Sequence, residues 1–189
     1  LGLDHRAVTS AAANRETFIR RPDLGRRLPD ADAAGLAGLG PVDVALVLGD
    51  GLSAMAVALN GAAFIAALAA RLRDLGLSFG PVVLAHQARV ALGDGIAQAM
   101  GATTVVMALG ERPGLSAADS LGAYITHLPR LGTPDSARNC ISNIRDAGLS
   151  VDQAADQAAH LITAMRATGQ SGVALSQHLS SGPLPHLQD

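Results

Sequence analysis

Residues 43–54 read DVALVLGDGLSA, which is an aliphatic run, a glycine-rich turn and the start of an alanine-rich segment. The run at 43–49 is short and apolar, which is typical of a strand buried in a parallel sheet. The segment at 52–75 has the length and composition of a helix, with Ser53 as its N-cap and Gly76 as its stop. A strand, a tight turn and a helix in this order predict an α/β domain.

The alternation of strands and helices continues along the chain. The further predicted elements are a strand at 80–87, a helix at 92–100, a strand at 103–109, a loop at 110–119, a strand at 121–127, a turn-rich stretch at 133–145 and a helix at 151–168. This order predicts an α/β fold of the Rossmann-like kind, with a mostly parallel sheet flanked by helices. Because ligands bind such sheets at the carboxyl ends of the strands, we expect a site in the loops after Leu48, His86 and Leu109.

The length of 189 residues is sufficient for one self-supporting core. Residues 1–40 are rich in arginine and end in a Pro/Asp/Ala/Gly stretch, so we expect an N-terminal arm or connector there. The α/β domain is then predicted over residues 41–189. The first residue is Leu1 rather than methionine, and we therefore expect the natural protein to be longer.

Composition excludes several classes of protein. The apolar fraction of 49% and charged fraction of 16% exclude a disordered tail and a fibre. A net charge of −2, three Phe, one Tyr and no Trp argue against a nucleic-acid partner, because a protein binds nucleic acid through positive charge and stacking aromatic rings.

The segment at 52–75 is long enough to span a membrane, but its Ala-rich composition and the interruption at Asn60 and Gly61 favour a buried helix and no membrane. A single cysteine, Cys140, cannot form an internal disulfide, which favours a reducing cytoplasm.

The turn at 49–54 also matches the G-x-G-x-x-G/A dinucleotide pattern in the right context, so a stand-alone dinucleotide-binding oxidoreductase is one alternative. Asp50 would place a carboxylate beside the pyrophosphate, and the next strand ends in His86 and Gln87 rather than in a ribose-binding acid. A glycine turn shaped for close packing or for another ligand is therefore preferred. A non-catalytic assembly module, docked through its arginine-rich arm, is the third alternative.

The sequence predicts neither a metal site nor a catalytic residue. The six histidines are scattered without an i,i+4 pair, and no second cysteine lies near Cys140. Cys140 also has no base near it in sequence that would make it a nucleophile. Two segments are nevertheless dense in hydrogen-bonding groups, GERPGL at 110–115 and RNCISNI at 138–144. Taken alone, these residues suit a solvated turn and side chains that bond local backbone.

Together with other motifs, these segments resemble the small (light) subunit of ethanolamine ammonia-lyase, a two-subunit adenosylcobalamin enzyme. The resemblance covers nearly the whole chain, although the family usually has Gly at the position of Ala88. Residues 3–5 resemble a point well inside the family, so an N-terminal family segment is absent from this sequence. The matching motifs are RRPDLGRR at 20–27, DGLSA at 50–54, QARVA at 87–91, GERPGL at 110–115, DSL at 119–121 and RNCISNI at 138–144.

The resemblance implies that this chain, with a large subunit that holds the substrate, converts ethanolamine to acetaldehyde and ammonia by radical migration after Co–C homolysis. It implies that Val90, Glu111 and Cys140 contact adenosylcobalamin where the subunits meet. It also implies an isolated chain without activity, and a cytoplasmic complex that is free or enclosed in a bacterial microcompartment. The Asp-x-His-x-x-Gly signature of base-off cobalamin proteins does not occur in this sequence, so the dimethylbenzimidazole is expected to stay on cobalt.

Overall fold

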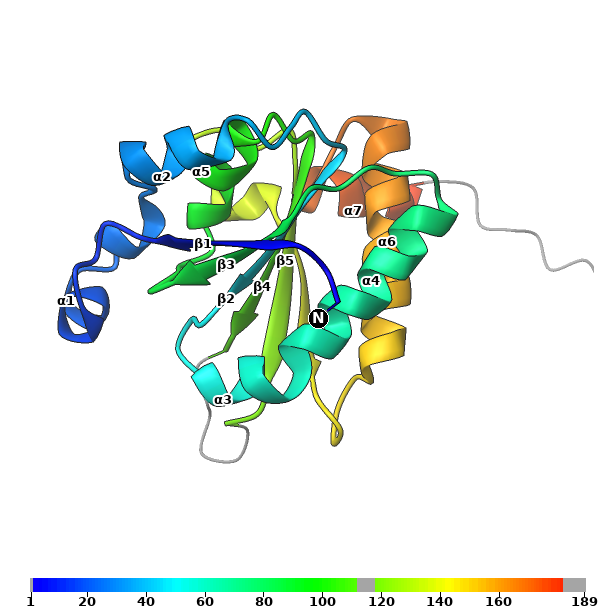
Figure 1. Ribbon diagram of the computed structural model, residues 1–189. Helices are drawn as coiled ribbons and strands as arrows, with labels where there is room; N and C mark the ends of the chain where they lie inside the picture. The colour runs from blue at the N-terminus through cyan, green and yellow to red at the C-terminus, as the bar shows by residue number, and fades with distance from the viewer. Residues whose placement is uncertain (1, 112–117, 182–189) are drawn as a thin grey trace, which may run out of the picture.

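A computed structural model describes residues 2–111 and 118–181, and shows one six-stranded sheet with helices on both faces (Figure 1). Part of the predicted loop at 110–119, including most of the GERPGL motif, lies outside the described residues. The strand order is β1-β3-β2-β4-β5-β6. The strands are β1 (His5–Thr9), β2 (Val44–Gly49), β3 (Val82–His86), β4 (Thr104–Gly110), β5 (Leu121–His127) and β6 (Asn139–Ile144).

The sheet is mixed. Strands β1, β3, β2 and β4 are parallel to one another, whereas β5 pairs antiparallel with both β4 and β6. Parallel neighbours need a crossover of roughly a dozen residues or more, usually a helix, and residues 111–120 provide less than that between β4 and β5. The predicted α/β class is confirmed, but a mostly parallel, Rossmann-like sheet is not.

The N-terminal 40 residues differ from the predicted arm. Strand β1 extends the sheet beside β3, and the segment after it forms α1 (Arg15–Arg20), the 3₁₀ turn η1 (Leu24–Arg26) and α2 (Asp30–Leu36). The side chains of Phe18 and Leu36 are fully buried. The arginine-rich composition does not indicate that these residues belong to the domain, because an edge strand and short helices need few buried apolar side chains.

The alanine-rich segment forms a continuous helix from Ala54 to Asp74, as predicted. It consists of α3 (Ala54–Ala56), a π-helical turn η2 (Val57–Gly61) and α4 (Ala62–Asp74). The Ser53 side chain caps it by accepting a hydrogen bond from the backbone N–H of Ala56 at 3.2 Å, and Gly76 follows its end with a φ of 68°. By length and composition alone this helix could cross a membrane, but its apolar side chains at Phe64, Ile65, Leu68 and Leu72 lie in the core.

Two apolar cores lie on the two faces of the sheet. Helices α4 and α6 (Val151–Thr168) cover one face (Figure 1), and α6 has the bounds predicted from the sequence. The other face is covered by α5 (Leu92–Ala99), which packs on β2 and β4, and by α2. Strand β6 and the 3₁₀ turn η3 (Asp135–Ala137) were not predicted, because residues 133–145 are polar and turn-rich. The helix α7 (Val173–Ser181) was not predicted either. Strand β6 forms the edge of the sheet beside β5.

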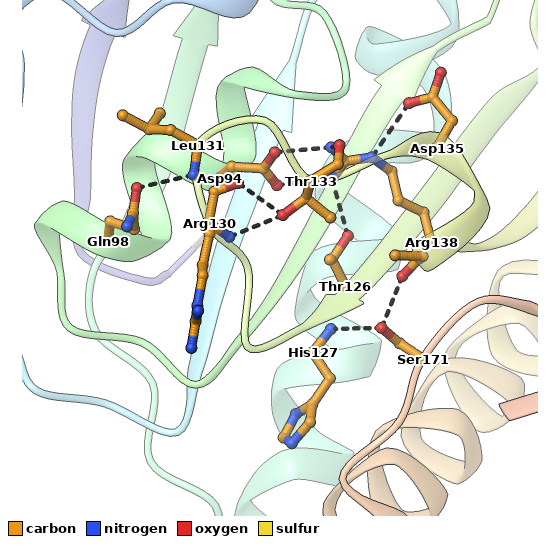
Figure 2. A network of polar contacts seen from close by, with 11 residues as sticks. Asp94, Gln98, Thr126, His127, Arg130, Leu131, Thr133, Asp135, Arg138 and Ser171 are labelled. Carbon is orange, nitrogen blue, oxygen red and sulfur yellow. Dashed lines mark hydrogen bonds and ion pairs between the residues drawn. The ribbon is translucent and has the colours of Figure 1, made fainter. Parts of the chain in front are cut away.

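A buried ion pair joins α5 to the start of β6 (Figure 2). The guanidinium of Arg138 donates a hydrogen bond of 2.7 Å to each carboxylate oxygen of Asp94, and the two side chains are 4% and 1% exposed. Arg138 also donates to Thr126 Oγ1 at 3.1 Å, the Thr133 carbonyl at 2.8 Å and Asp135 Oδ1 at 3.3 Å. The hydrogen bonds and charge of Asp94 raise the pKa of Arg138 further, so the guanidinium stays ionised. Every nitrogen of this guanidinium therefore has a partner.

This arrangement predicts that Asp94→Ala lowers the free energy of unfolding by about 3–5 kcal/mol, because it leaves a buried guanidinium without its counter-charge. Asp135→Ala is the matched control. It removes the carboxylate that touches the same guanidinium but is 86% exposed, and should cost at most about 1 kcal/mol. Urea unfolding followed by circular dichroism measures both losses, and equal losses would contradict the assigned role of Asp94.

Candidate functional site

Two adjoining cavities of about 330 and 400 Å³ form one cleft at the carboxyl ends of the parallel strands, which we call the carboxyl-edge cleft. Arg89, Val90 and Tyr124 line both cavities, so the two lie side by side. The first is also lined by Arg26, Ala91, Asp135, Arg138 and Cys140, and the second by Gly51, Leu52, Ala88, Leu109, Gly110 and Glu111. The position of the cleft is the expected one, because open α/β sheets bind ligands at the carboxyl ends of their strands.

The glycine-rich turn after β2 forms one wall of the cleft. The Asp50 carboxylate accepts hydrogen bonds from the backbone N–H groups of Gln87 at 2.9 Å and Ala88 at 3.1 Å, and so ties this turn to the loop after β3. Gly51 has a φ of 54° and lies so close to Gly110 that a Cβ would overlap its carbonyl oxygen. The turn is thus shaped for close packing, and its carboxylate would repel a pyrophosphate. This geometry disfavours the dinucleotide alternative.

Val90 lies in the loop between β3 and α5, half-buried, with its side chain in both cavities. The N-terminal segment holds this loop in place. The backbone N–H of Arg89 donates to the carbonyl of Gly25 at 2.9 Å, and its guanidinium lies 4.4 Å from the centre of the Phe18 ring. The residues that precede β2 therefore position one wall of the cleft.

Glu111 follows β4 and is held over β5. Its Oε2 accepts a hydrogen bond from Ser120 Oγ at 2.8 Å, and its Oε1 lies 3.5 Å from the hydroxyl of Tyr124, which donates to it. The carboxylate sits above Gly122, where a Cβ would overlap Oε1. Glu111 is therefore a fixed hydrogen-bond acceptor and not a solvated turn residue.

Cys140 on β6 and Tyr124 on β5 are directly opposite each other in the antiparallel pair, so their side chains share one face of the sheet. Although Cys140 is solvent-accessible, desolvation of its thiol and the nearby charge of Glu111 raise its pKa. Burial raises the pKa of the Tyr124 phenol, and the acidic groups of Cys140 and Glu111 add to the effect. Both groups are therefore neutral near pH 7, and the thiol is a weak nucleophile.

The structure thus brings together all three residues that the sequence singled out, Val90, Glu111 and Cys140. Sequence reasoning missed Tyr124. Its neighbours Ala123 and Ile125 both belong to the core on the α4 and α6 face of the sheet, and successive side chains of a strand point to opposite faces, so Tyr124 points to the other face. It also missed the pairing of Asp94 with Arg138, which no spacing along the chain reveals.

Chemically, the cleft offers carboxylates, guanidinium groups, two neutral polar groups and compact apolar contacts. The carboxylates are those of Glu111 and Asp135, the guanidinium groups those of Arg26, Arg89 and Arg138, and the neutral polar groups those of Tyr124 and Cys140. Among residues 2–111 and 118–181, no cluster of three or more His, Cys, Asp or Glu side chains could hold a metal ion. A site of this kind suits a ligand that carries both N–H donors and hydrogen-bond acceptors. Fold and site together define an α/β ligand-binding protein.

Comparisons with known proteins identify the family. The model of the family described as "Ethanolamine ammonia-lyase light chain (EutC)" matches residues 1–176. The chain is 49% identical over 177 residues to the ethanolamine ammonia-lyase small subunit of Rhodopseudomonas palustris, a match that covers 93% of this chain and 68% of that protein. It is 47% identical to the small subunit of Ralstonia nicotianae, with 89% and 64% covered, and 45% identical to that of Pseudomonas fluorescens strain SBW25, with 92% and 65% covered.

This chain belongs to the ethanolamine ammonia-lyase light-chain family, which is a family of lyase subunits. The resemblance seen in the sequence is confirmed, and so is the predicted function at the level of the family. The chain spans about two thirds of the length of these relatives.

The geometry of the cleft predicts that Glu111→Gln makes Cys140 more reactive, because the loss of a nearby negative charge lowers the pKa of the thiol. Alkylation by iodoacetamide at pH 8 should be at least about twofold faster, since the rate follows the thiolate fraction. The matched control is Asp135→Asn, which removes another carboxylate from the cleft wall and should leave the rate unchanged. Equal rates for Glu111→Gln and the wild-type chain would show that the two groups do not interact.

Proposed function

We propose that this chain is the small subunit of an ethanolamine ammonia-lyase and binds adenosylcobalamin in the carboxyl-edge cleft, together with a large subunit. The observation that carries the proposal is the convergence of Val90, Glu111 and Cys140 on one cleft from three separate parts of the sequence. These residues are the ones that the family resemblance assigns to the cofactor. The reaction proposed for the complex is conversion of ethanolamine to acetaldehyde and ammonia.

The donor set of the cleft fits a corrinoid. The corrin ring is edged with amide side chains, whose N–H groups need acceptors, and Glu111 is a carboxylate acceptor held in place by Ser120. Val90 supplies an apolar contact, while Cys140 supplies a compact neutral one. Cobalamin is much larger than this cleft, so the chain holds part of its rim and the partner covers the rest. When bound, the cofactor supplies the radical chemistry, and this chain binds and orients it.

In this proposal, no histidine of this chain coordinates cobalt. None of the described residues that line the cleft is a histidine, although His86 ends the neighbouring strand β3. The cleft therefore offers no imidazole to replace dimethylbenzimidazole, and we propose that the cofactor is bound base-on.

The proposed partner is the large subunit. Two large apolar side chains on the first turns of the long helix, Met55 and Leu59, are 56% and 62% exposed. They follow Leu52, which lines the cleft, so an apolar surface continues from the cleft onto this helix. A partner that covers the cofactor would bury these side chains as well, and would supply the residues for the substrate.

Glu111→Gln should retain assembly with the large subunit and weaken cobalamin binding about tenfold. The reason is that a hydrogen bond to a charged acceptor contributes about 1.5–3 kcal/mol, against about 1 for a neutral one, and about 1.4 kcal/mol is a factor of ten. Glu111→Leu should weaken binding further, because it leaves corrin amides buried and unpaired. Difference absorbance during titration of the assembled complex with cobalamin measures the dissociation constants.

The control for these variants is Glu16→Gln, which removes an exposed carboxylate on α1 and should leave the affinity unchanged. If neither Glu111 variant alters the dissociation constant for cobalamin, Glu111 does not belong to the cobalamin site. Retained assembly in all three variants would show that the losses arise in the cleft and not from disruption of the complex.

A further inference from the structure

Tyr124 lies between Glu111 and Cys140 and lines both cavities of the carboxyl-edge cleft. It is half-buried, and its ring packs against the core cluster on the α5 face of the sheet. That packing needs only the ring. The hydroxyl group therefore requires a separate explanation, because an apolar phenylalanine would fill the same space.

The hydroxyl of Tyr124 has a polar partner in the cleft. It donates to Glu111 Oε1 at 3.5 Å, and Cys140 lies directly opposite Tyr124 in the antiparallel pair of β5 and β6. The other carboxylate oxygen of Glu111 is held by Ser120 at 2.8 Å. Without Tyr124, a single hydrogen bond from a side chain would fix the carboxylate, which could then rotate about its last torsion angles.

The register of the sheet places this hydroxyl. Tyr124 is paired with Met107 on β4 and with Cys140 on β6, so the three side chains form one row across the sheet. Glu111 reaches that row because Gly122, two residues earlier on the same face of β5, has no side chain. Burial keeps the phenol protonated near pH 7, and so it remains a donor toward the carboxylate.

We propose that Tyr124 is a positioning residue of the cofactor site: its hydroxyl holds Glu111 in the orientation that accepts a ligand N–H. This inference rests on the proposed function, since it assigns the hydroxyl a role in cobalamin binding. It predicts that the hydroxyl acts through Glu111 and not on its own.

The test is Tyr124→Phe in the complex assembled with the large subunit. This variant keeps the ring and should weaken cobalamin binding about fivefold, because the hydrogen bond lost is long but made to a charged group. In combination with Glu111→Gln, the total loss should stay close to that of Glu111→Gln alone, about tenfold, rather than the product of about fiftyfold that independent sites would give. This double-mutant cycle distinguishes positioning from a general loss of stability.

Thr104→Val is the matched control. Thr104 is fully buried and its hydroxyl is 2.9 Å from His127 Nδ1, at the opposite end of β4 from Glu111. The variant removes a buried hydroxyl of the same sheet and should lower stability while leaving cobalamin affinity unchanged.

A spectroscopic readout is also available, because the sequence has one tyrosine and no tryptophan. Small subunit labelled with 3-fluorotyrosine and assembled with unlabelled large subunit should give one ¹⁹F signal, from position 124. That signal should shift on addition of cobalamin, and also in the Glu111→Gln variant without cobalamin.

The possible outcomes distinguish a failure of the proposed function from a failure of the inference about Tyr124. If the wild-type complex does not bind cobalamin, the proposed function is wrong and this inference falls with it. If the wild-type complex binds cobalamin but Tyr124→Phe has the same affinity, or if its effect multiplies with that of Glu111→Gln, the inference about Tyr124 alone is overturned.

Discussion

The ion pair between Asp94 and Arg138 is the contact on which the rest of the cleft depends. It joins α5, which packs on the parallel strands β2 and β4, to the edge strand β6, which belongs to the antiparallel part of the sheet. Two charges removed from water are tolerated only with full hydrogen bonding, and Arg138 has it. Cys140 comes two residues after Arg138, so the geometry of this pair also sets the position of the thiol in the cleft.

Three further contacts complete the site from separate parts of the chain. Asp50 ties the turn after β2 to the loop after β3, and Arg89 stacks on Phe18 of the N-terminal segment. Glu111 is fixed over β5 by Ser120. Each contact restricts a binding group before the ligand arrives, which lowers the entropic cost of binding. Such preorganisation suits the proposed role, in which this subunit orients a cofactor and its partner binds the substrate.

The sequence predicted the elements whose signals are local. The helix α6 has a capping box at Ser150 and Gln153 and a left-handed Gly169 at its end, and its bounds are the predicted ones. The bounds of β5 were also predicted correctly. Strand β6 was missed because its pairing with β5 is irregular and Asn143 within it has a φ of 60°, which breaks the alternation. The family resemblance supplied the three candidate site residues, whose role stays a prediction. The contacts that hold them were not predictable, because they join residues distant in sequence.

The proposed function requires that the chain binds a corrinoid together with a large subunit and does not bind a dinucleotide. Titration of cobalamin and of NAD into the small subunit alone, the large subunit alone and the assembled complex, followed by absorbance, tests it most directly. We expect a saturable spectral change with cobalamin in the complex, a much weaker one with either subunit alone, and none with NAD. Equal cobalamin affinity of the large subunit with and without this chain, or saturable NAD binding by this chain, would contradict it.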